Sequence, residues 1–352
     1  DIAEVLAQGS TRSTVILRSG VQIDLRVVPE VSYGAALLYF TGSKAHNVAL
    51  RTMALNQGYK IKEYGLFKGE KILASAFEED IYHALRLPYI EPELRENNGE
   101  LEAALQRALP KLVTQEDIQG DLHAHTLATD GTETISGMAT AAQKLGYAYL
   151  AITDHSKHLS IANGLDKKKL MAQIEEIDQL NSLLNNFTLL KSSEVDILED
   201  GSLDFPDEIL AQLDFCVCAV HSRFNLSKEK QTQRILRAME NSYFRILAHP
   251  TGRLLGEREP YDIDMEKIIK AAARLGRVLE INCQPERMDL TDQYCRMAKD
   301  SGVKMSISTD AHSKLQLNYM SYGVGQARRG WLEKKDVINT MSLKKLKEYL
   351  RK

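Results

Sequence analysis

The chain has 352 residues, of which 43% are apolar and 26% are charged, and its formal net charge is −3. This composition is that of an ordinary folded protein, and it excludes a disordered chain, a collagen and a small disulfide scaffold. No apolar run approaches the roughly 18 residues that a membrane-spanning helix needs, and the first residues lack the apolar core of a signal peptide. The four cysteines show no Cys-x-x-Cys spacing and are expected to be reduced and packed in the core. We therefore expect a cytoplasmic protein with no membrane partner.

The first part of the chain predicts strands and short helices. Two runs of alternating apolar and polar residues flank Ser19 and Gly20, which predicts a β-hairpin over residues 15–27. Residues 1–72 carry nine Lys and Arg against six Asp and Glu. This basic end is therefore the better candidate for contacting phosphates.

A change of composition marks the expected domain boundary. Residues 88–110 are rich in Pro, Glu and Asn, which is typical of a linker that leads into a short helix. We expect a first part over residues 1–90, a linker over 91–117 and a second domain over 118–352.

The second domain has a regular pattern of short apolar runs that end in polar or ionisable residues and are followed by helical periodicities. Seven such runs are candidate strands: 120–125, 150–155, 189–196, 215–221, 244–249, 278–283 and 304–312. Strands that alternate with helices predict an α/β fold with a parallel sheet. In a closed barrel of this type, ligands gather at the carboxyl ends of the strands.

Histidine and carboxylate side chains stand at these strand ends. His123 and His125 are two residues apart, so both rings point to the same side of their strand, as a shared metal ion requires. The whole set is His123, His125, Asp130, His155, Glu194, His221, His249, Asp310 and His312. Independent core histidines would not all fall at the same end of successive strands, and we therefore predict metal binding. His46, His83 and His158 lie outside this pattern and are expected to be structural.

The ligand chemistry indicates the metal and the substrate class. Imidazole and carboxylate without thiolate suit Zn²⁺, Mn²⁺ or Fe²⁺, and the sequence does not select among them. Nine ligands are too many for one ion, and three divalent ions would exceed the charge of three carboxylates by about three units. Such a surplus favours a phosphate ester, because clustered ions activate water and stabilise the oxygens of a phosphoryl displacement. Arg223, Arg253 and Arg287 follow strand ends and are candidates for binding phosphate oxygens, with a solvated loop position or a structural ion pair as the alternative for each.

Seven motifs of this domain resemble the PHP (polymerase and histidinol phosphatase) family. They are D-L-H-A-H-T (121–126), T-D-H-S (153–156), E-V-D (194–196), V-H-S (220–222), H-P-T-G-R (249–253), E-I-N (280–282) and T-D-A-H-S (309–313). The resemblance covers residues 118–352 and implies a distorted (β/α)₇ barrel with up to three divalent ions.

The resemblance also assigns the ligands. It places a first ion on His123, His125, Glu194 and Asp310. It places a second ion, bridged by Glu194, on His221 and His249, and a third ion on Asp130, His155 and His312. All nine positions hold suitable residue types, which indicates a functional site.

Upstream motifs resemble the end of the palm and the thumb of a family X DNA polymerase, a family that joins to a PHP domain in bacteria and archaea. They are Q-I-D-L-R-V-V-P (22–29), Y-F-T-G-S-K-A-H-N (39–47) and E-Y-G-L-F (63–67). The resemblance implies that Asp24 is the third catalytic carboxylate, with Mg²⁺ as cofactor where the polymerase site is complete. The residues that would line the incoming nucleotide are Tyr39, Phe40, Thr41, Gly42, Ser43 and Asn47.

The sequence departs from the polymerase pattern in one respect. Nucleotidyl transfer needs a further pair of carboxylates, normally Asp-x-Asp, and Asp1 is the only aspartate before Asp24. The DNA-binding helix-hairpin-helix region, the fingers and most of the palm are also missing. We expect the C-terminal part of a longer polymerase, which lacks its N-terminal portion and cannot polymerise alone.

The leading hypothesis is a metal-dependent phosphoesterase that acts in DNA repair on the 3′ ends of gapped or primed DNA. The resemblance implies 3′-5′ exonuclease activity and, in some members, 3′-phosphatase activity or cleavage at abasic sites. Glu194, His125 and Arg253 are the expected catalytic residues.

Two alternatives stay open. One is a small-molecule phosphomonoesterase of the histidinol-phosphatase type, and another is a non-catalytic domain in which metals stabilise the fold while the thumb docks DNA. An amidohydrolase also uses a His-x-His pair on a barrel, but the additional group of Asp130, His155 and His312 favours the PHP family.

Overall fold

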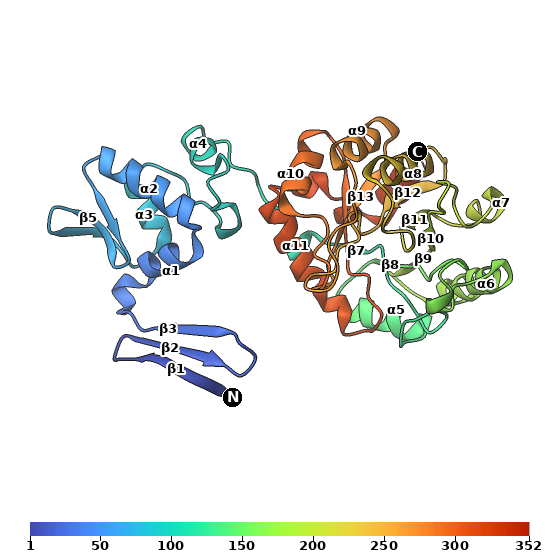
Figure 1. Cartoon of the computed structure of the whole chain (residues 1–352), viewed down its shortest axis with the longest axis horizontal. Coiled ribbons are helices and arrows are strands. Elements are labelled where there is room, and N and C mark those ends of the chain that lie inside the picture. The colour runs from blue at the N-terminus through green and yellow to red at the C-terminus, as the bar shows by residue number, and fades with distance from the viewer. Residues whose placement is uncertain (352) are drawn as a thin grey trace. The chain divides into compact units, whose positions relative to one another are not determined.

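The computed structural model describes residues 1–351 and divides the chain into two compact units. Unit 1 comprises Asp1–Leu109 and unit 2 begins at Pro110 (Figure 1). This boundary falls inside the range 91–117, which the sequence predicts as a linker. Within the described residues, no helix combines the length and the apolar character that crossing a membrane requires.

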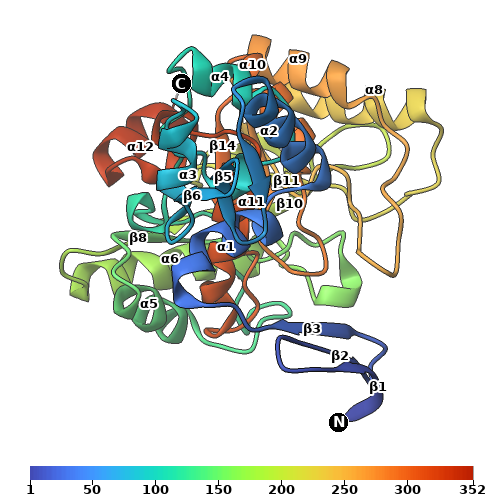
Figure 2. The ribbon, with the colours of Figure 1, turned by 90° about the vertical axis from the view of Figure 1, so that its left-hand side faces the viewer.

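Unit 1 begins with an antiparallel sheet of three strands, β1 (Ile2–Gln8), β2 (Arg12–Leu17) and β3 (Gln22–Arg26). Strand β2 pairs with β3 so that Thr14 lies opposite Asp24, which confirms the predicted hairpin. Gly20 has a φ of 83° in the connecting turn, a conformation that glycine adopts without strain. Both ribbon views show this sheet at one end of unit 1 (Figures 1 and 2).

The rest of unit 1 combines helices with a second antiparallel sheet in the order β4-β5-β6. Its elements are α1 (Tyr33–Thr41), α2 (Lys44–Asn56), β4 (Lys60–Lys62), β5 (Gly65–Lys68), β6 (Lys71–Ala74), α3 (Glu78–Ala84) and α4 (Glu100–Leu105). Short 3-10 helices lie at Glu30–Ser32 and Pro92–Leu94.

The first half of the predicted linker is instead packed within unit 1. Arg95 is fully buried, and its Nη1 atom donates to Glu78 Oε1 at 2.6 Å while its Nε atom donates to the Ile90 carbonyl at 2.9 Å. His46 is also fully buried, with its Nδ1 atom 2.6 Å from Glu100 Oε1. Two charged residues of this segment, Arg95 and Glu100, are therefore partners of groups in α3 and α2.

Unit 2 has a mixed α/β fold with parallel strands, and each of the seven predicted runs contains a strand. The strands are β7 (Gly120–Asp121), β8 (Tyr149–Ile152), β9 (Thr188–Lys191), β10 (Glu194–Asp196), β11 (Cys216–Ala219), β12 (Phe244–Leu247), β13 (Val278–Asn282) and β14 (Met305–Ser308). The third run is divided at Ser192 and Ser193, so that β9 pairs with β8 and β10 pairs with β11. The result is a three-stranded and a five-stranded parallel sheet.

Isolated parallel bridges connect the segments that follow these two sheets. They pair Ala124 with Ala311, and His155 with Glu194. The segments after β7 and β8 therefore approach the five-stranded sheet at two places, the segment after β14 and the start of β10.

Helices alternate with the strands, and Figure 1 shows them around the strands of unit 2. They are α5 (Ile135–Lys144), α6 (Lys167–Leu183), α7 (Asp207–Leu210), α8 (Lys228–Met239), α9 (Met265–Leu275), α10 (Asp292–Asp300), α11 (Met320–Arg329) and α12 (Leu343–Leu350), with 3-10 helices at Gln115–Asp117, Ser160–Ala162, Gln316–Tyr319, Lys334–Asp336 and Ile338–Thr340. Asp166 caps α6 by accepting from the Lys169 N–H group. All four cysteines are free and buried, which confirms their predicted place in the core.

Replacing Arg95 by Met should destabilise unit 1 by about 3 kcal/mol, because the buried Glu78 carboxylate would lose its charged partner. Hydrogen exchange followed by mass spectrometry should show faster exchange in α1 to α4 and unchanged exchange in unit 2. The exposed Arg18, replaced by Met, is the control. Equal exchange in the two variants would contradict the stabilising role of the Arg95–Glu78 pair.

Candidate metal centre

The predicted ligands come together in unit 2 because they follow the carboxyl ends of parallel strands. His123 lies two residues after β7, His221 two residues after β11, and Glu194 is the first residue of β10. Three groups have ligand atoms within 4.8 Å of one another: His123, His125, Glu194 and Asp310; His125, Asp130, His155 and His312; and His155, Glu194 and His221. His249 joins them through Glu194.

Glu194 lies at the centre of the cluster with only 1% of its side chain exposed. Its Oε2 atom is 2.9 Å from His155 Nδ1, 3.3 Å from His123 Nε2 and 3.5 Å from His125 Nε2. The Glu194 N–H group donates to the Thr153 carbonyl at 2.9 Å, which fixes the backbone of this residue against the segment that follows β8. One carboxylate oxygen is therefore directed at three imidazole rings.

The other Glu194 oxygen faces two further histidines. Oε1 is 2.7 Å from His249 Nε2 and 3.2 Å from His221 Nε2. Burial alone would raise the pKa of Glu194, but the neighbouring His221 and His155 hold it well below its usual value. Glu194 is thus an ionised carboxylate shared between two sets of histidines, which is the arrangement of a bridging ligand.

The buried ring nitrogens of the cluster test whether a metal ion fits this site. Four buried ring nitrogens make no hydrogen bond: His123 Nε2, His125 Nδ1, His125 Nε2 and His155 Nδ1. Buried polar atoms in proteins nearly always have a partner. Burial, with the nearby His312 and His155, lowers the pKa of His125 to about 4, which favours the neutral ring that binds metals. Because these nitrogens converge on carboxylate oxygens, the donor set fits divalent cations.

Asp310 completes the first group. Its Oδ1 atom is 3.0 Å from His125 Nε2 and 3.4 Å from His123 Nε2. Both Asp310 and His249 adopt positive φ angles, 52° and 27°, which are rare for residues other than glycine. Such conformations cluster at functional sites, where the surrounding structure maintains them.

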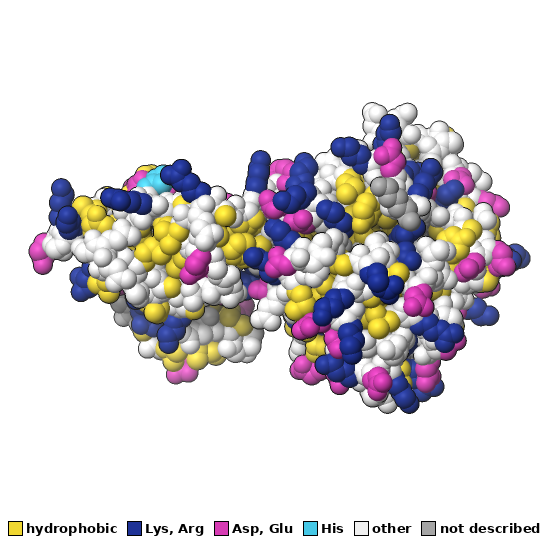
Figure 3. Space-filling model, turned by 90° about the horizontal axis from the view of Figure 1, so that it is seen from above, with side chains coloured by type: hydrophobic (Ala, Val, Ile, Leu, Met, Phe, Trp, Pro, Cys, Tyr) yellow, Lys and Arg dark blue, Asp and Glu magenta, His cyan; other side chains and the backbone are white. Residues whose placement is uncertain are grey.

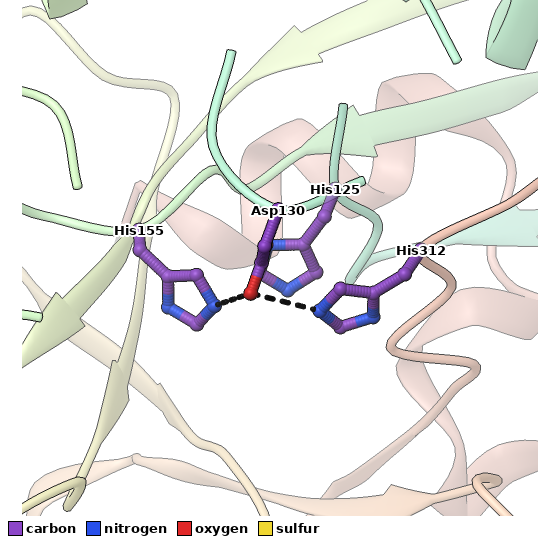
Figure 4. A group of neighbouring side chains, drawn as sticks. All are labelled: His125, Asp130, His155 and His312. Atoms are coloured by element: carbon purple, nitrogen blue, oxygen red, sulfur yellow. Dashed lines mark ion pairs between the residues drawn. The ribbon is translucent and has the colours of Figure 1, made fainter. Parts of the chain in front are cut away.

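A second group is built around Asp130 (Figure 4). Its Oδ2 atom is 3.2 Å from His155 Nε2 and 3.4 Å from His312 Nε2. The His125 ring stacks on His155 and on His312, with centroid distances of 4.4 and 4.2 Å. Asp130, His155 and His312 form the set that the PHP resemblance assigns to one ion, and the structure adds His125 to it.

Carboxylates that the sequence analysis did not single out hold the ligands in place. Glu280 Oε1 lies 2.7 Å from the ring nitrogen Nδ1 of His123, and Glu280 Oε2 accepts from the backbone N–H group of His249. Asp196 Oδ1 lies 3.0 Å from His221 Nδ1. Such contacts fix the orientation of an imidazole whose other nitrogen binds metal. Asp196 is two residues from Glu194 on the same strand, and this spacing was a signal for its role.

The three arginines predicted to bind phosphate differ in their surroundings. Arg287 Nε is 3.6 Å from Asp310 Oδ2, so this guanidinium lies beside the ligands. Arg253 instead donates to the carbonyls of Arg287 and Met288, and Arg223 is 64% exposed and paired with Glu199 at 3.0 Å. Arg223 and Arg253 are thus both bound to partners on other segments of the chain. For Arg253 we expected a catalytic role.

The predicted polymerase carboxylate lies on the sheet of unit 1. Asp24 accepts from Thr14 Oγ1 at 2.6 Å and from Gln22 Nε2 at 2.8 Å, and it pairs with Arg12 at 3.4 Å. The hydrogen bonds from Thr14 and Gln22 lower the pKa of Asp24. These contacts occupy Asp24 with the side chains of its own sheet.

The residues predicted to line a nucleotide meet where α1 is followed by α2. Asn47 Nδ2 donates to the Tyr39 carbonyl at 2.9 Å and to the Gly42 carbonyl at 3.3 Å. Ser43 caps α2, and the Tyr39 and Phe40 rings meet edge to face with centroids 4.9 Å apart. The structure therefore brings these five residues together.

Comparisons with known proteins find relatives of the chain. Residues 36–96 match the family model described as DNA polymerase beta thumb. Over its whole length the chain is 40% identical to the DNA polymerase/3′-5′ exonuclease PolX of Bacillus subtilis. Over its whole length the chain is therefore similar to a family X DNA polymerase. It spans 62% of the length of the Bacillus relative.

Two further similarities concern parts of the chain. A stretch covering 66% of it is 30% identical to a probable phosphatase of Thermoanaerobacter sp. (strain X514), of which 94% is covered. A crystal structure of Leishmania infantum polymerase beta, a ternary P/T complex, aligns with 27% of the chain and 47% of that protein, at 27% identity and a TM-score of 0.26.

Replacing Glu194 by Gln should lower the metal content of the purified chain, because the substitution removes a charge that two of the three groups share. Elemental analysis by mass spectrometry after dialysis against Mn²⁺ or Zn²⁺ measures the ions per chain. The control is His158→Ala, which removes an exposed histidine outside the three groups. Full metal content in the Glu194→Gln chain would disprove the bridging role.

Replacing Glu280 by Gln should weaken metal binding about 10–100-fold, as is typical when a residue that orients a ligand is changed. Competition with a fluorescent chelator gives the dissociation constant, and circular dichroism confirms that the fold is kept. Glu266→Gln on the exposed side of α9 is the matched control. An unchanged dissociation constant in Glu280→Gln would show that His123 does not need this carboxylate.

Proposed function

We propose that unit 2 is a metal-dependent phosphoesterase that hydrolyses phosphate esters at DNA 3′ ends, with 3′-5′ exonuclease activity as its main reaction. The observation that carries the proposal is Glu194, a buried carboxylate whose two oxygens face two sets of histidines. We also infer that the bridges from Ala124 to Ala311 and from His155 to Glu194 close the strands into the distorted seven-stranded barrel of the PHP family. The proposed domains remain a thumb part, a connecting segment and the PHP domain.

The residues present would hold up to three divalent ions. One ion would lie on His123, His125, Glu194 and Asp310, a second on Glu194, His221 and His249, and a third on Asp130, His155 and His312. When bound, such ions polarise the phosphate ester and supply an activated water. Mn²⁺, Zn²⁺ and Fe²⁺ all suit these donors.

The protein's own side chains prepare the site for this chemistry. Asn282 Nδ2 donates to Glu280 Oε2 at 3.0 Å and to Asp310 Oδ2 at 3.1 Å, and so holds the orienting and the ligating carboxylates in fixed positions. Arg287 lies beside Asp310 and is the arginine best placed to bind a phosphate oxygen. In this proposal Arg253 acts by holding the loop of Arg287, through the Arg287 and Met288 carbonyls.

The choice of DNA as the substrate is supported by the relatives. The Bacillus protein is named a DNA polymerase/3′-5′ exonuclease, and residues 36–96 match a polymerase thumb. We do not propose polymerisation by this chain alone, because two-metal catalysis needs carboxylates in addition to Asp24. Removal of a 3′-phosphate and cleavage at abasic sites would use the same centre and are proposed as secondary reactions.

One alternative has specific support. Relatives that match about two thirds of the chain are named probable phosphatases, which favours a small phosphomonoester as substrate. Metal ions that only stabilise the fold would also satisfy the buried ring nitrogens. One assay separates these possibilities from the proposed DNA-end hydrolysis.

The assay uses the purified chain with Mn²⁺ and 5′-labelled primed DNA that ends in a 3′-hydroxyl or a 3′-phosphate, followed on a sequencing gel. We expect stepwise shortening by the unaltered chain and by His158→Ala. In His125→Ala the rate should fall about 100-fold or more, because His125 belongs to two of the ligand groups. Parallel reactions with p-nitrophenyl phosphate measure activity on a small phosphomonoester.

Three outcomes would contradict the proposal. Full activity of His125→Ala would remove the active site from this cluster. Hydrolysis of p-nitrophenyl phosphate without any change to DNA would favour the small-molecule phosphatase. If the chain binds metal ions but hydrolyses neither DNA nor p-nitrophenyl phosphate, the ions would only stabilise the fold.

A further inference from the structure

Two helices of unit 1 end with an arginine in the left-handed backbone conformation. Arg86 follows α3 with a φ of 63°, and Arg107 follows α4 with a φ of 54°. After α3, the Arg86 N–H group donates to the His83 carbonyl and the Leu87 N–H group to the Tyr82 carbonyl, both at 2.9 Å. This pair of hydrogen bonds is the Schellman motif, in which the left-handed position is normally glycine.

The end of α4 repeats this arrangement. The Arg107 N–H group donates to the Ala104 carbonyl at 3.1 Å, and the Ala108 N–H group donates to the Ala103 carbonyl at 2.8 Å. A β-carbon is strained in this conformation, whereas glycine is not. The negative end of a helix dipole stabilises the charge of an arginine. An arginine in the last helical turn would have the same stabilisation without the strained left-handed backbone. The presence of arginine at both positions therefore points to a role for the two side chains.

Both side chains line one hollow of about 700 Å³, which we call the Arg86–Arg107 hollow. Its other lining residues are His83, Leu87, Pro88 and Leu109. Its lining thus contains three basic side chains, apolar residues and no carboxylate. Over residues 1–351, no ion pair of Arg86, Arg107 or His83 with an acidic group is found, whereas Glu78 of α3 and Glu100 of α4 are paired. In the face drawn in Figure 3, several Lys and Arg side chains of unit 1 are exposed, with Asp and Glu side chains among them.

This combination is suited to a phosphate group. Two guanidinium groups without acidic partners offer planar sets of N–H donors that match phosphate oxygens. Phosphate contacts of this kind fix the position of a nucleic acid without reading its sequence. The apolar residues of the hollow add a surface for the sugar or base that accompanies each phosphate.

We propose that the Arg86–Arg107 hollow binds backbone phosphates of a DNA strand. The choice of DNA as the anion rests on the function proposed above. The contact is separate from the metal centre of unit 2 and from the residues at the start of α2. Arg107 also lies beyond residues 36–96, the range of the thumb match, so this contact combines the thumb with the segment that follows it.

The test replaces both arginines by glycine, which suits the left-handed backbone and removes both charges. DNA binding is measured by fluorescence anisotropy with labelled primed DNA in EDTA at several salt concentrations. We expect about tenfold weaker binding at low salt and a salt dependence of the logarithmic affinity that is shallower by about 2, or about 1 for each lost phosphate contact. The melting temperature should stay equal or rise, because glycine relieves the strain.

Two controls make the result specific. The double variant Lys144→Gln, Lys168→Gln removes two exposed charges of unit 2 outside the hollow, and it should keep the affinity and the salt dependence. A labelled deoxynucleoside triphosphate in the same titration tests a free nucleotide as the source of the phosphate. Loss of nucleotide binding without loss of DNA binding would overturn the proposal.

The proposal would also be wrong if the glycine variant kept the wild-type salt dependence, or if the control variant lost as much affinity. A loss of thermal stability together with DNA affinity would instead assign the arginines to the helix ends. The test is independent of catalysis, since EDTA removes the metal ions. If the glycine variant has a shallower salt dependence but the unaltered chain does not hydrolyse DNA, this inference stands and the proposed function is wrong. If the unaltered chain hydrolyses DNA but the glycine variant keeps its salt dependence, the proposed function stands and this inference is wrong.

Discussion

Unit 2 is organised around the burial of one ionised carboxylate. A buried charge is destabilising unless partners compensate it, and Glu194 has five histidine rings within 3.5 Å of its two oxygens. These rings come from segments after β7, β8, β11 and β12. The position of Glu194 therefore requires that four separate strand ends meet at one point, which the parallel arrangement provides.

The division of the third strand serves the same purpose. Residues before Ser192 pair with β8, and residues from Glu194 onward pair with β11. The Glu194 backbone is held between the two sheets, and its carboxylate can therefore face histidines from both. The buried carboxylates of Glu280 and Asp196 then fix the Nδ1 atoms of His123 and His221. The Nε2 atoms of these rings are left directed at Glu194.

The sequence predicts the features that depend on local periodicity. Each apolar run of unit 2 contains a strand, and eight of the nine predicted ligands lie in or directly after those runs, whereas Asp130 lies in the loop after β7. These residues meet because parallel strands bring their ends together. The sequence does not predict contacts between distant loops. The role of Glu280 depends on a residue 157 positions away, and the partners of Arg253 depend on the course of the loop at 287–288. In the segment after Ile90, Arg95 and Glu100 pair with partners in α3 and α2, and composition does not reveal such pairs.

The boundary between Leu109 and Pro110 has a kinetic consequence. The two units belong to one polypeptide, so a nucleic acid bound by unit 1 would reach the metal centre of unit 2 without a second diffusional encounter. Tethered modules typically experience effective concentrations in the millimolar range. The centre itself can then have weak affinity for a DNA end and still be saturated, which favours rapid release of each product before the next end is engaged.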